Sequence, residues 1–408
     1  MNKVWTGLLL VSLATGSIRF VFFDDKAIFG RMLESLFSMA KTGFETSLGL
    51  TGILALWLGI LKIGEKAGAV GLLTRLLSPL LRRLMPGVPE NHPALGAITM
   101  NIAANVLGLD NAATPIGIQA MRELQKLNPE PDTLSNAQIL FLVINTSAVT
   151  LLPVAVFTYR AQLGALNPTD VFLPILLATF CSTMVGLLAV ASVQRLRLWD
   201  PVVLGYLLGL GGVIAGLAYS LTGLPQEIMQ ARSALISQVL LLGLIASFLV
   251  AAWFRKINAY ECFIEGAKEG FHTAVTIIPY LVAMLVAIGL LRSSGIMDLV
   301  MDGLRDILRS FSADTRFVEA LPTAMMKPFS GSGARAMMID AMQTHGADSL
   351  PGRMASIMQG STETTFYVLA VYCGAVGIKR IRHALACGLL ADVAGLTAAI
   401  FIGYWFFG

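Results

Sequence analysis

Long apolar runs separated by short charged stretches set the pattern of this chain. About nine of the runs reach roughly 20 residues, the length that an α-helix needs to cross about 30 Å of hydrocarbon. The pattern therefore predicts an all-α polytopic membrane protein with about nine transmembrane helices. These helices are expected at residues 4–23, 45–64, 136–158, 170–193, 201–222, 233–254, 272–291, 353–374 and 382–406.

Four other stretches do not fit a helix that crosses the membrane. Segments 72–86, LLTRLLSPLLRRLMP, and 296–311, IMDLVMDGLRDILRSF, place charges at helical spacing, which is typical of helices that lie in the membrane interface. Segments 93–127 and 316–345 begin apolar and are then interrupted by small and polar residues. Each of their arms has about 12 to 16 residues, roughly 18 to 24 Å at 1.5 Å per residue. We therefore predict two re-entrant helical hairpins.

The two halves of the chain are similar to each other. KTGF at 41–44 matches KEGF at 268–271, and NTSAVT at 145–150 matches GSTETT at 360–365. Further pairs at the first offset, 227 positions, are Gly68 with Gly295, Leu77 with Leu304 and Arg82 with Arg309. The order of interfacial helices, spans and broken segments is also the same in both halves. The sequence therefore predicts a duplicated unit.

The way in which the broken segments enter the membrane decides the orientation of the copies. Re-entrant hairpins leave an odd number of crossings between equivalent points, which gives inverted repeats, a common plan of secondary transporters. Kinked crossing helices would instead give parallel repeats. The predicted organisation is an N-terminal transmembrane helix at 1–26, a first repeat at 27–200, two linking helices at 201–256 and a second repeat at 257–408.

The distribution of basic residues gives the expected orientation. About 16 Lys and Arg fall on the side of the N-terminus and about 11 on the other, and cytoplasmic loops carry the excess. We therefore expect a protein of the cell inner membrane with a cytoplasmic N-terminus. Residues 3–23 have features of a signal peptide, but the apolar run continues through RFVFF, which favours a retained first helix.

Composition agrees with a membrane location and excludes several functions. The chain is 56% hydrophobic and 13% charged, whereas soluble domains have about 25% charged residues. The net charge of +4 does not point to nucleic acid, because basic residues in short loops set membrane orientation. The four cysteines lack CxxC spacing, so we predict neither a metal site nor a disulfide framework.

The interrupted segments supply the candidate binding groups. In MNIAANVLGLDNAATPIG, residues 100–117, we expect a turn at 108–110 and a second arm that Thr114 caps ahead of Pro115. In KPFSGSGARAMM, residues 327–338, we expect a turn at 330–333 with Ser332 as the cap. Irregular backbone at membrane depth requires protein or water around it, so the two tips are expected to meet at a central polar site. Tight packing of small residues in lipid is the alternative.

The N-terminus of a half-helix favours an anionic or electron-rich group such as a carboxylate, phosphate or carbonyl. Polar residues at the tips and in the spans that follow are therefore the expected substrate ligands. They are Asn105, Asp110, Asn111, Thr114, Asn145, Ser147, Lys327, Ser330, Ser332, Arg335, Gln359, Ser361 and Thr362.

Acidic residues inside apolar helices are the candidates for coupling to an ion, because an intramembrane ionisable residue is a functional hypothesis by default. The expected site for H+ or Na+ consists of Glu363, Asp392 and Thr364. For Glu363, contact with the substrate or an ion pair with Lys327 or Arg335 is the alternative. For Asp392 the alternative is a hydrogen bond between packed helices.

Motifs of enzymes and of ATP-driven pumps are missing from the sequence. No Ser/His/Asp grouping, HExxH or Walker A pattern occurs, and SGSGAR lacks the P-loop spacing. Paired acids could act as acid and base, but nothing supplies a nucleophile. We therefore predict neither an enzyme nor a cofactor, and ion gradients remain as the energy source.

Long motifs carry a family resemblance. NIAANVLGLDNAATPIGIQAMRELQ resembles spore maturation protein A, and KPFSGSGARAMM, MQGSTETTFYVLAVYCGAVGIKRIRHAL and LLADVAG resemble spore maturation protein B, so the chain is similar to a fusion of the two. These families belong with the nucleoside recognition, or gate, domains, which are similar to segments of concentrative nucleoside transporters and of ferrous-iron transporters. The resemblance implies a transporter-like protein whose tips, 105–114 and 330–335, face the substrate.

The expected function is ion-gradient-coupled secondary transport of a small polar solute, nucleoside-like or carboxylate-bearing, by alternating access. The alternative is a non-transporting envelope or lipid-handling factor that acts through a partner. The expected partners are the solute, H+ or Na+ and the lipid bilayer, without nucleic acid, and a homo-oligomer is compatible with the sequence.

Overall fold

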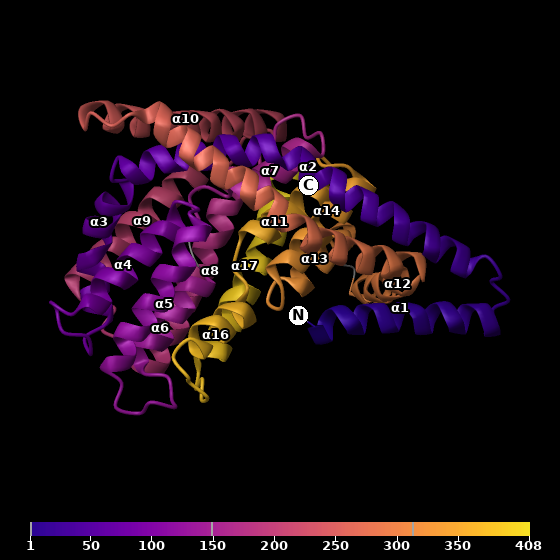
Figure 1. Ribbon diagram of the computed structural model, residues 1–408, viewed down its shortest axis with the longest axis horizontal. Coiled ribbons are helices and arrows are strands. Elements are labelled where there is room, and N and C mark those ends of the chain that lie inside the picture. The colour runs from indigo at the N-terminus through magenta and orange to yellow at the C-terminus, as the bar shows by residue number, and fades with distance from the viewer. Residues whose placement is uncertain (1, 148–149, 312–313) are drawn as a thin grey trace. The chain divides into compact units, whose positions relative to one another are not determined.

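The computed structural model describes the backbone of residues 2–147, 150–311 and 314–408, and all of their side chains except those of 2–4 and 110–112. These residues form helices and no strand. Within this part of the chain, seven helices are long and apolar enough to cross a membrane: α1 (Asn2–Phe22), α2 (Ile28–Lys66), α8 (Phe172–Gln194), α9 (Pro201–Tyr219), α10 (Gln226–Phe254), α11 (Ala259–Ser293) and α17 (Ala384–Phe407). The chain is an all-α polytopic membrane protein, as predicted (Figure 1).

Two of the expected crossing helices are broken. The stretch 136–158 forms α6 (Asn136–Thr146) and α7 (Val154–Gln162), and the stretch 353–374 forms α15 (Leu350–Gly360) and α16 (Thr365–Gly374). The prediction of continuous helices at these places is wrong. At the first break, α6 ends where the Thr146 carbonyl accepts the Glu363 N–H at 2.7 Å. The hydroxyls of Thr146 and Ser147 also donate to the Val143 carbonyl at 2.9 Å, and this carbonyl keeps the Ser147 N–H at 3.1 Å.

Both interrupted segments form helical hairpins with short arms. The first is α4 (Pro93–Val106) and α5 (Asp110–Lys126); the second follows a 3-10 turn, η1 (Arg316–Ala320), and consists of α13 (Leu321–Met326) and α14 (Gly331–His345). The longest arm has 17 residues, about 26 Å at 1.5 Å per residue, which is shorter than the hydrocarbon layer. Their re-entrant placement and the inverted relation of the halves stay predictions.

The caps of the second arms differ from those expected. At the first hairpin, Gly108 has a φ of 72° and closes α4, so that α5 begins at Asp110 and the pair Thr114–Pro115 lies inside the helix. The second cap is Ser330, whose backbone is extended and whose hydroxyl accepts the Gly333 N–H at 2.8 Å. Both predicted caps are therefore wrong, because the helix starts earlier than the capping residues suggested.

The chain divides into two compact units. Unit 1 contains residues 1–58, 155–168 and 267–359, and unit 2 contains residues 59–154, 169–266 and 360–408. Each unit draws on both halves of the chain, so this division differs from the predicted repeat boundaries, which stay a prediction. Two of the transitions between units fall beside the helix breaks, after residues 154 and 359.

Close contact between α2 and α11 organises unit 1. A Cβ on Gly43 would lie 3.0 Å from the Cα of Val282, and one on Gly270 would lie 2.6 Å from the Cα of Ala55. Between the two contacts, the position advances along α2 from 43 to 55 and goes back along α11 from 282 to 270, so the helices are antiparallel. Glycine is needed at both crossings, because any side chain would push the backbones apart.

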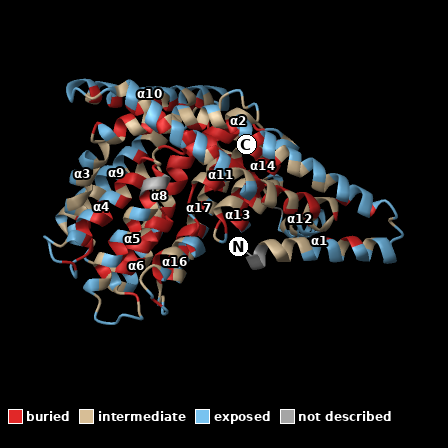
Figure 2. Ribbon diagram, viewed as in Figure 1, coloured by how far each residue is buried: buried red, intermediate tan, exposed pale blue. Residues whose placement is uncertain are grey.

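Unit 2 is built around α8 and α17, which pack along most of their lengths. Figure 2 shows the buried positions that follow these two helices. The apolar core beside them includes Phe141 and Val143 of α6, Leu187 and Val190 of α8 and Cys387 of α17. Two glycines bring other elements close, since a Cβ on either would lie 2.9 Å from a side-chain carbon of its neighbour. These are Gly388 against Thr365 and Gly395 against Ser182.

The two amphipathic helices start in the same way. Gly68 precedes α3 (Ala69–Leu84) with a φ of 85°, and Gly295 precedes α12 (Ile296–Ser310) with a φ of 82°. This left-handed conformation favours glycine. The two glycines form one of the sequence pairs at offset 227, and the duplication stays a prediction.

Candidate functional site

The carbonyl groups at the end of α6 find partners from other elements of unit 2. The last carbonyls of a helix have no partner within it. The Thr146 carbonyl accepts the Glu363 N–H at 2.7 Å and lies 2.9 Å from the Thr362 hydroxyl. The Ser147 carbonyl accepts the Thr183 hydroxyl of α8. Residues 146–147 and 361–364, named the break pair here, are thus joined directly.

The tip of the first hairpin contacts the segment that follows α6. The Val106 carbonyl, at the end of α4, accepts the Leu151 N–H at 2.8 Å. A Cβ on Gly108 would lie 2.6 Å from the Leu152 carbonyl oxygen. Glycine at this turn is therefore required both by its positive φ and by the neighbouring backbone. The tip and the break pair belong to one polar region of unit 2.

Asp392 of α17 adds a carboxyl group to this region. Its side chain is only 1% exposed, and Oδ1 lies 2.5 Å from the Thr362 hydroxyl. The neighbouring Ala391 carbonyl accepts the Ser182 hydroxyl of α8 at 2.9 Å, which fixes this turn of α17. Burial of a carboxyl group in an apolar span is costly unless it is protonated, paired or hydrogen-bonded.

The Thr362 hydroxyl has one proton and three oxygen neighbours, of which the Glu363 carbonyl, at 3.4 Å, is the most distant. The hydroxyl lies 2.5 Å from the Asp392 carboxyl and 2.9 Å from the Thr146 carbonyl. A carbonyl oxygen can only accept. When Asp392 is protonated, it donates to Thr362 and Thr362 donates to Thr146; when Asp392 is ionised, the hydroxyl turns to the carboxylate. The protonation state of Asp392 therefore sets the number of hydrogen bonds within the break pair.

A ladder of asparagine amides runs from the first hairpin to α6. Asn101 donates to the Ala113 carbonyl at 2.7 Å and joins the two arms, and Asn105 donates to Asn145 Oδ1 at 2.9 Å. A Cβ on Gly117 would collide with the Tyr372 hydroxyl and lie 2.9 Å from the Asn101 amide. Amides both donate and accept, so this ladder suits a solute with amide, carbonyl or hydroxyl groups.

The second hairpin, in unit 1, presents a buried ammonium group. Lys327 is 3% exposed, and Nζ donates to the Gln359 carbonyl at 2.7 Å. That carbonyl belongs to the last turn of α15, where a cation is favourable to the helix dipole. The Gln359 side-chain oxygen is buried without a recorded hydrogen bond. On α14, the guanidinium of Arg335 lies 5.7 Å from the ring centroid of Tyr159.

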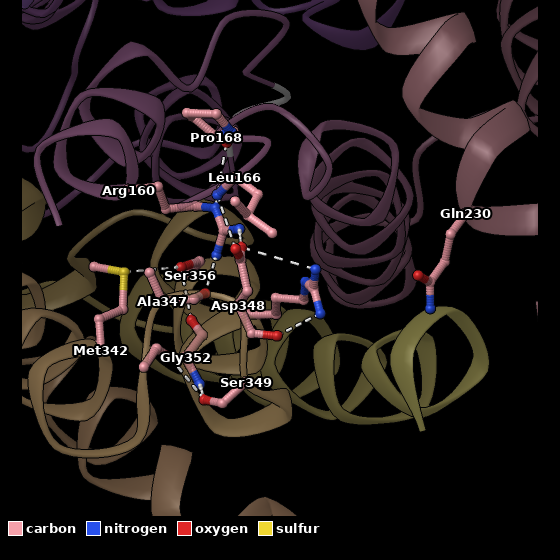
Figure 3. A network of polar contacts seen from close by, with 12 residues as sticks. Arg160, Leu166, Pro168, Gln230, Met342, Ala347, Asp348, Ser349, Gly352 and Ser356 are labelled. Carbon is pink, nitrogen blue, oxygen red and sulfur yellow. Dashed lines mark hydrogen bonds and ion pairs between the residues drawn. The ribbon is translucent and has the colours of Figure 1, made fainter. Parts of the chain in front are cut away.

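A buried arginine that the sequence analysis did not single out holds α7 against the start of α15 (Figure 3). Arg160 is fully buried and donates to the Ala347 carbonyl at 2.6 Å, to Asp348 Oδ1 at 3.0 Å and to the Pro168 carbonyl at 3.3 Å. The other oxygen of Asp348 accepts the Leu166 N–H at 2.8 Å. This network lies within unit 1 and fixes one half of each broken helix.

The structure places the predicted site residues in two groups. The first lies in unit 2: Asn105, Thr114, Asn145, Ser147, Ser361, Thr362, Glu363, Thr364 and Asp392. The second lies in unit 1: Lys327, Ser330, Ser332, Arg335 and Gln359. Asp110 and Asn111 begin α5, and their side chains lie outside the described residues. Contact of the two tips across one pocket stays a prediction.

Sequence reasoning missed several residues of these networks. Asn101 stands four positions before Asn105, and this helical spacing places both on one face, so a periodicity search could have found it. The hydroxyl donors Ser182 and Thr183 lie in an apolar helix, where single hydroxyls are common and carry no signal. Arg160 gave no local signal either, because two of its partners, Ala347 and Asp348, lie 187 and 188 positions further on.

Comparison with known proteins adds an independent result. A family model described as Gate, nucleoside recognition, matches residues 47–163 and 274–379, more than half of the chain. Spore maturation protein B of Bacillus subtilis (strain 168) is 50% identical over 165 residues, which are 40% of this chain and 91% of the relative. Spore maturation protein A of the same organism is 37% identical over 182 residues, 45% of this chain and 89% of the relative.

Fold and sequence similarity together identify the kind of protein. This is a multi-pass α-helical membrane protein that contains helical hairpins and discontinuous helices with polar groups at the breaks. The chain belongs to the Gate family of nucleoside recognition proteins, together with the two spore maturation proteins, as the sequence motifs predicted. It is therefore a membrane protein of a transport-related family.

Proposed function

We propose that the protein is an ion-gradient-coupled secondary transporter of a small polar solute, nucleoside-like or carboxylate-bearing, that works by alternating access. One observation carries this proposal. In unit 2, the Thr362 hydroxyl is shared between a buried carboxyl group and the carbonyl at a helix break. Secondary transporters bind substrate and coupling ion at discontinuous helices, and a buried intramembrane acid is functional by default.

Coupling follows from the chemistry of the break pair. Protonated Asp392 leaves the Thr362 hydroxyl free to donate to the Thr146 carbonyl, while ionised Asp392 takes that hydroxyl for itself. The carbonyl then keeps only the Glu363 N–H. Proton binding thus tightens the break pair and proton release loosens it. Na+ would act similarly, since the carboxylate, hydroxyl and carbonyl oxygens are all suitable ligands for a hard cation.

The solute is assigned to the amide ladder of Asn101, Asn105 and Asn145. Its donors and acceptors match the edge of a nucleobase, and its amide N–H groups also suit a carboxylate. The side chain of Glu363 is exposed although its backbone is bonded into the break pair. We propose that this side chain passes the coupling ion between the break pair and the solution.

Alternating access requires two bodies that move relative to each other. The chain passes from one compact unit to the other beside both helix breaks, after residues 154 and 359. Backbone that lacks a helix ladder can absorb a change in dihedral angles, so the breaks are suitable hinges. The proposal places the protein in the cell inner membrane with its N-terminus in the cytoplasm.

Transport in a purified system tests the proposal. The full-length protein is reconstituted in liposomes, and uptake of a panel of nucleosides and small carboxylates is measured under an imposed H+ or Na+ gradient. We expect uptake of at least one solute, abolished when an ionophore collapses the gradient. That solute should also raise the melting temperature in detergent. Absence of both effects across the panel would contradict transport and favour the alternative of an envelope or lipid-handling factor.

A further inference from the structure

A large hollow lies in unit 2, apart from the break pair, where α3 meets the end of α8 and the start of α9. Its volume is about 1010 Å³, at the upper end of the roughly 300–1,000 Å³ of small-molecule pockets. Fifteen residues line it. The charged ones are Arg75, Arg82, Arg83, Arg195, Arg197, Glu90 and Asp200.

The charge of this hollow is strongly positive. Five arginines face two acids, and the one recorded ion pair among these seven joins Arg83 to Asp200 at 3.9 Å. Among the residues that the structure describes, no ion pair or side-chain hydrogen bond is recorded for the other four arginines. They come from two segments more than 100 positions apart. All five arginines are exposed to solvent. The fold therefore gathers positive charge that is open to an anion from outside the chain.

Polar groups inside the hollow add donors for such an anion. Thr74 and Ser78 line it beside the arginines. The Thr74 hydroxyl is buried and has no hydrogen-bond partner. A guanidinium group binds phosphate oxygens through two parallel N–H donors, and a hydroxyl can complete the shell. The lining offers five guanidinium groups, and guanidinium is a common ligand of phosphate, so this set of side chains suits a phosphate group.

Exposed apolar side chains lie close in sequence to residues that line the hollow, and they indicate where the phosphate comes from. Leu72 and Leu76 of α3 are 69% and 57% exposed, and Trp199 before α9 is 87% exposed. The Tyr206 hydroxyl donates to the Leu76 carbonyl and ties α3 to α9. Exposed leucines beside arginines on an amphipathic helix are typical of a segment in the membrane interface, and tryptophan is enriched there. A lipid is therefore the expected source of the phosphate.

The amphipathic helix of the other half provides a contrast. In α12 the predicted counterpart of Arg82 is Arg309, which pairs with Asp306 at 3.7 Å, and Arg305 pairs with Asp302 and Glu319. The helix contains three aspartates, whereas α3 contains no acid. The arginines of α12 thus pair with acids of their own helix, whereas those of α3 have no acid on their helix to pair with. The positive hollow is therefore a property of this one site.

We propose that this hollow binds the phosphate headgroup of one anionic phospholipid, with the acyl chains along Leu72, Leu76 and Trp199. Basic pockets between helices on the cytoplasmic side bind such headgroups. The site does not depend on transport, so a protein that fails to transport would still bind the lipid.

Lipid titration of the full-length protein tests this site. Melting temperature is measured in detergent with increasing phosphatidylglycerol or with phosphatidylcholine of the same acyl chains. We expect saturable stabilisation by phosphatidylglycerol alone. Each arginine near a membrane surface contributes about fivefold in affinity, so R82Q should weaken half-saturation about fivefold and R82Q/R197Q about 25-fold. The matched control R309Q should leave it unchanged.

Three outcomes would overturn the proposal. Equal stabilisation by both lipids would mean that the headgroup charge is not recognised. A loss in R309Q as large as in R82Q would mean that any surface arginine has the effect. Stabilisation by inorganic phosphate at the same concentration, without lipid, would assign the site to a free anion. Should the double variant fail to fold, the two single variants and the lipid comparison still decide the matter.

Discussion

Replacing Arg160 by methionine tests how much the buried network of unit 1 stabilises the protein. The guanidinium is fully buried and donates three hydrogen bonds, at 2.6, 3.0 and 3.3 Å. Each bond of a charged group contributes about 1.5–3 kcal/mol, but burial of the charge costs several kcal/mol, so the bonds cannot simply be added. Loss of one partner of a buried pair costs about 3–5 kcal/mol.

The exposure of the partner sets the expected value within that range. The Asp348 side chain is 26% exposed, so its carboxylate keeps access to water after the substitution. We therefore expect R160M to lower the free energy of unfolding by about 3 kcal/mol, at the lower end of the range. Reversible unfolding in mixed micelles with increasing sodium dodecyl sulfate measures this quantity.

Two further variants complete this test. R309M removes an exposed arginine with one ion pair and should change stability by less than about 0.5 kcal/mol. The double variant R160M/D348N should be more stable than the sum of the single effects predicts, with a coupling of about 1.5 kcal/mol or more. If the free energy of unfolding of R160M lies within about 0.5 kcal/mol of the wild-type value, the network does not stabilise the protein as expected.

Two more predictions concern packing and pH. Because a Cβ on Gly117 would meet the Tyr372 hydroxyl, G117A should lower the melting temperature. Gly96 has open space around it, so G96A should raise the melting temperature slightly through helix propensity. Equal effects of the two substitutions would contradict the packing at Gly117. In the turn between α1 and α2, the hydrogen bond from Arg31 holds the pKa of Asp25 below its usual 3.8. Its stabilising effect should therefore be present at neutral pH and be lost as the pH falls below that value, and D25N should abolish this acid dependence of the melting temperature.

Apolar run length was enough to predict the class of fold and seven of the spans. It failed at 136–158 and 353–374, because hydropathy averaged over about 20 residues does not register where backbone hydrogen bonds stop. NTSAVT and GSTETT are too short to lower that average. The end of α6 instead involves a contact that is distant in sequence, because the Thr146 carbonyl accepts the Glu363 N–H.

The chemistry of the site was predictable only where residue type alone is informative. Asp392 and Glu363 stood out because acids are rare in apolar spans, and Asn105 and Asn145 because they interrupt apolar sequence. The pairing of Thr362 with Asp392 depends on the close packing of α17 that Gly388 and Gly395 permit. The spacing of these residues along the sequence gives no sign of that contact. The same holds for the hollow lined by arginines of α3 and of the α8–α9 connection.

Ion flux through reconstituted protein shows whether Asp392 holds the coupling ion at the break pair. Liposomes with a trapped pH- or sodium-sensitive dye report ion movement while the identified solute is taken up. We expect coupled flux for the wild type and for S182A, which removes a neighbouring hydrogen bond without a titratable group. We expect D392N to bind the solute but to move no ion with it. Coupled flux at the wild-type rate in D392N would mean that Asp392 does not hold the ion.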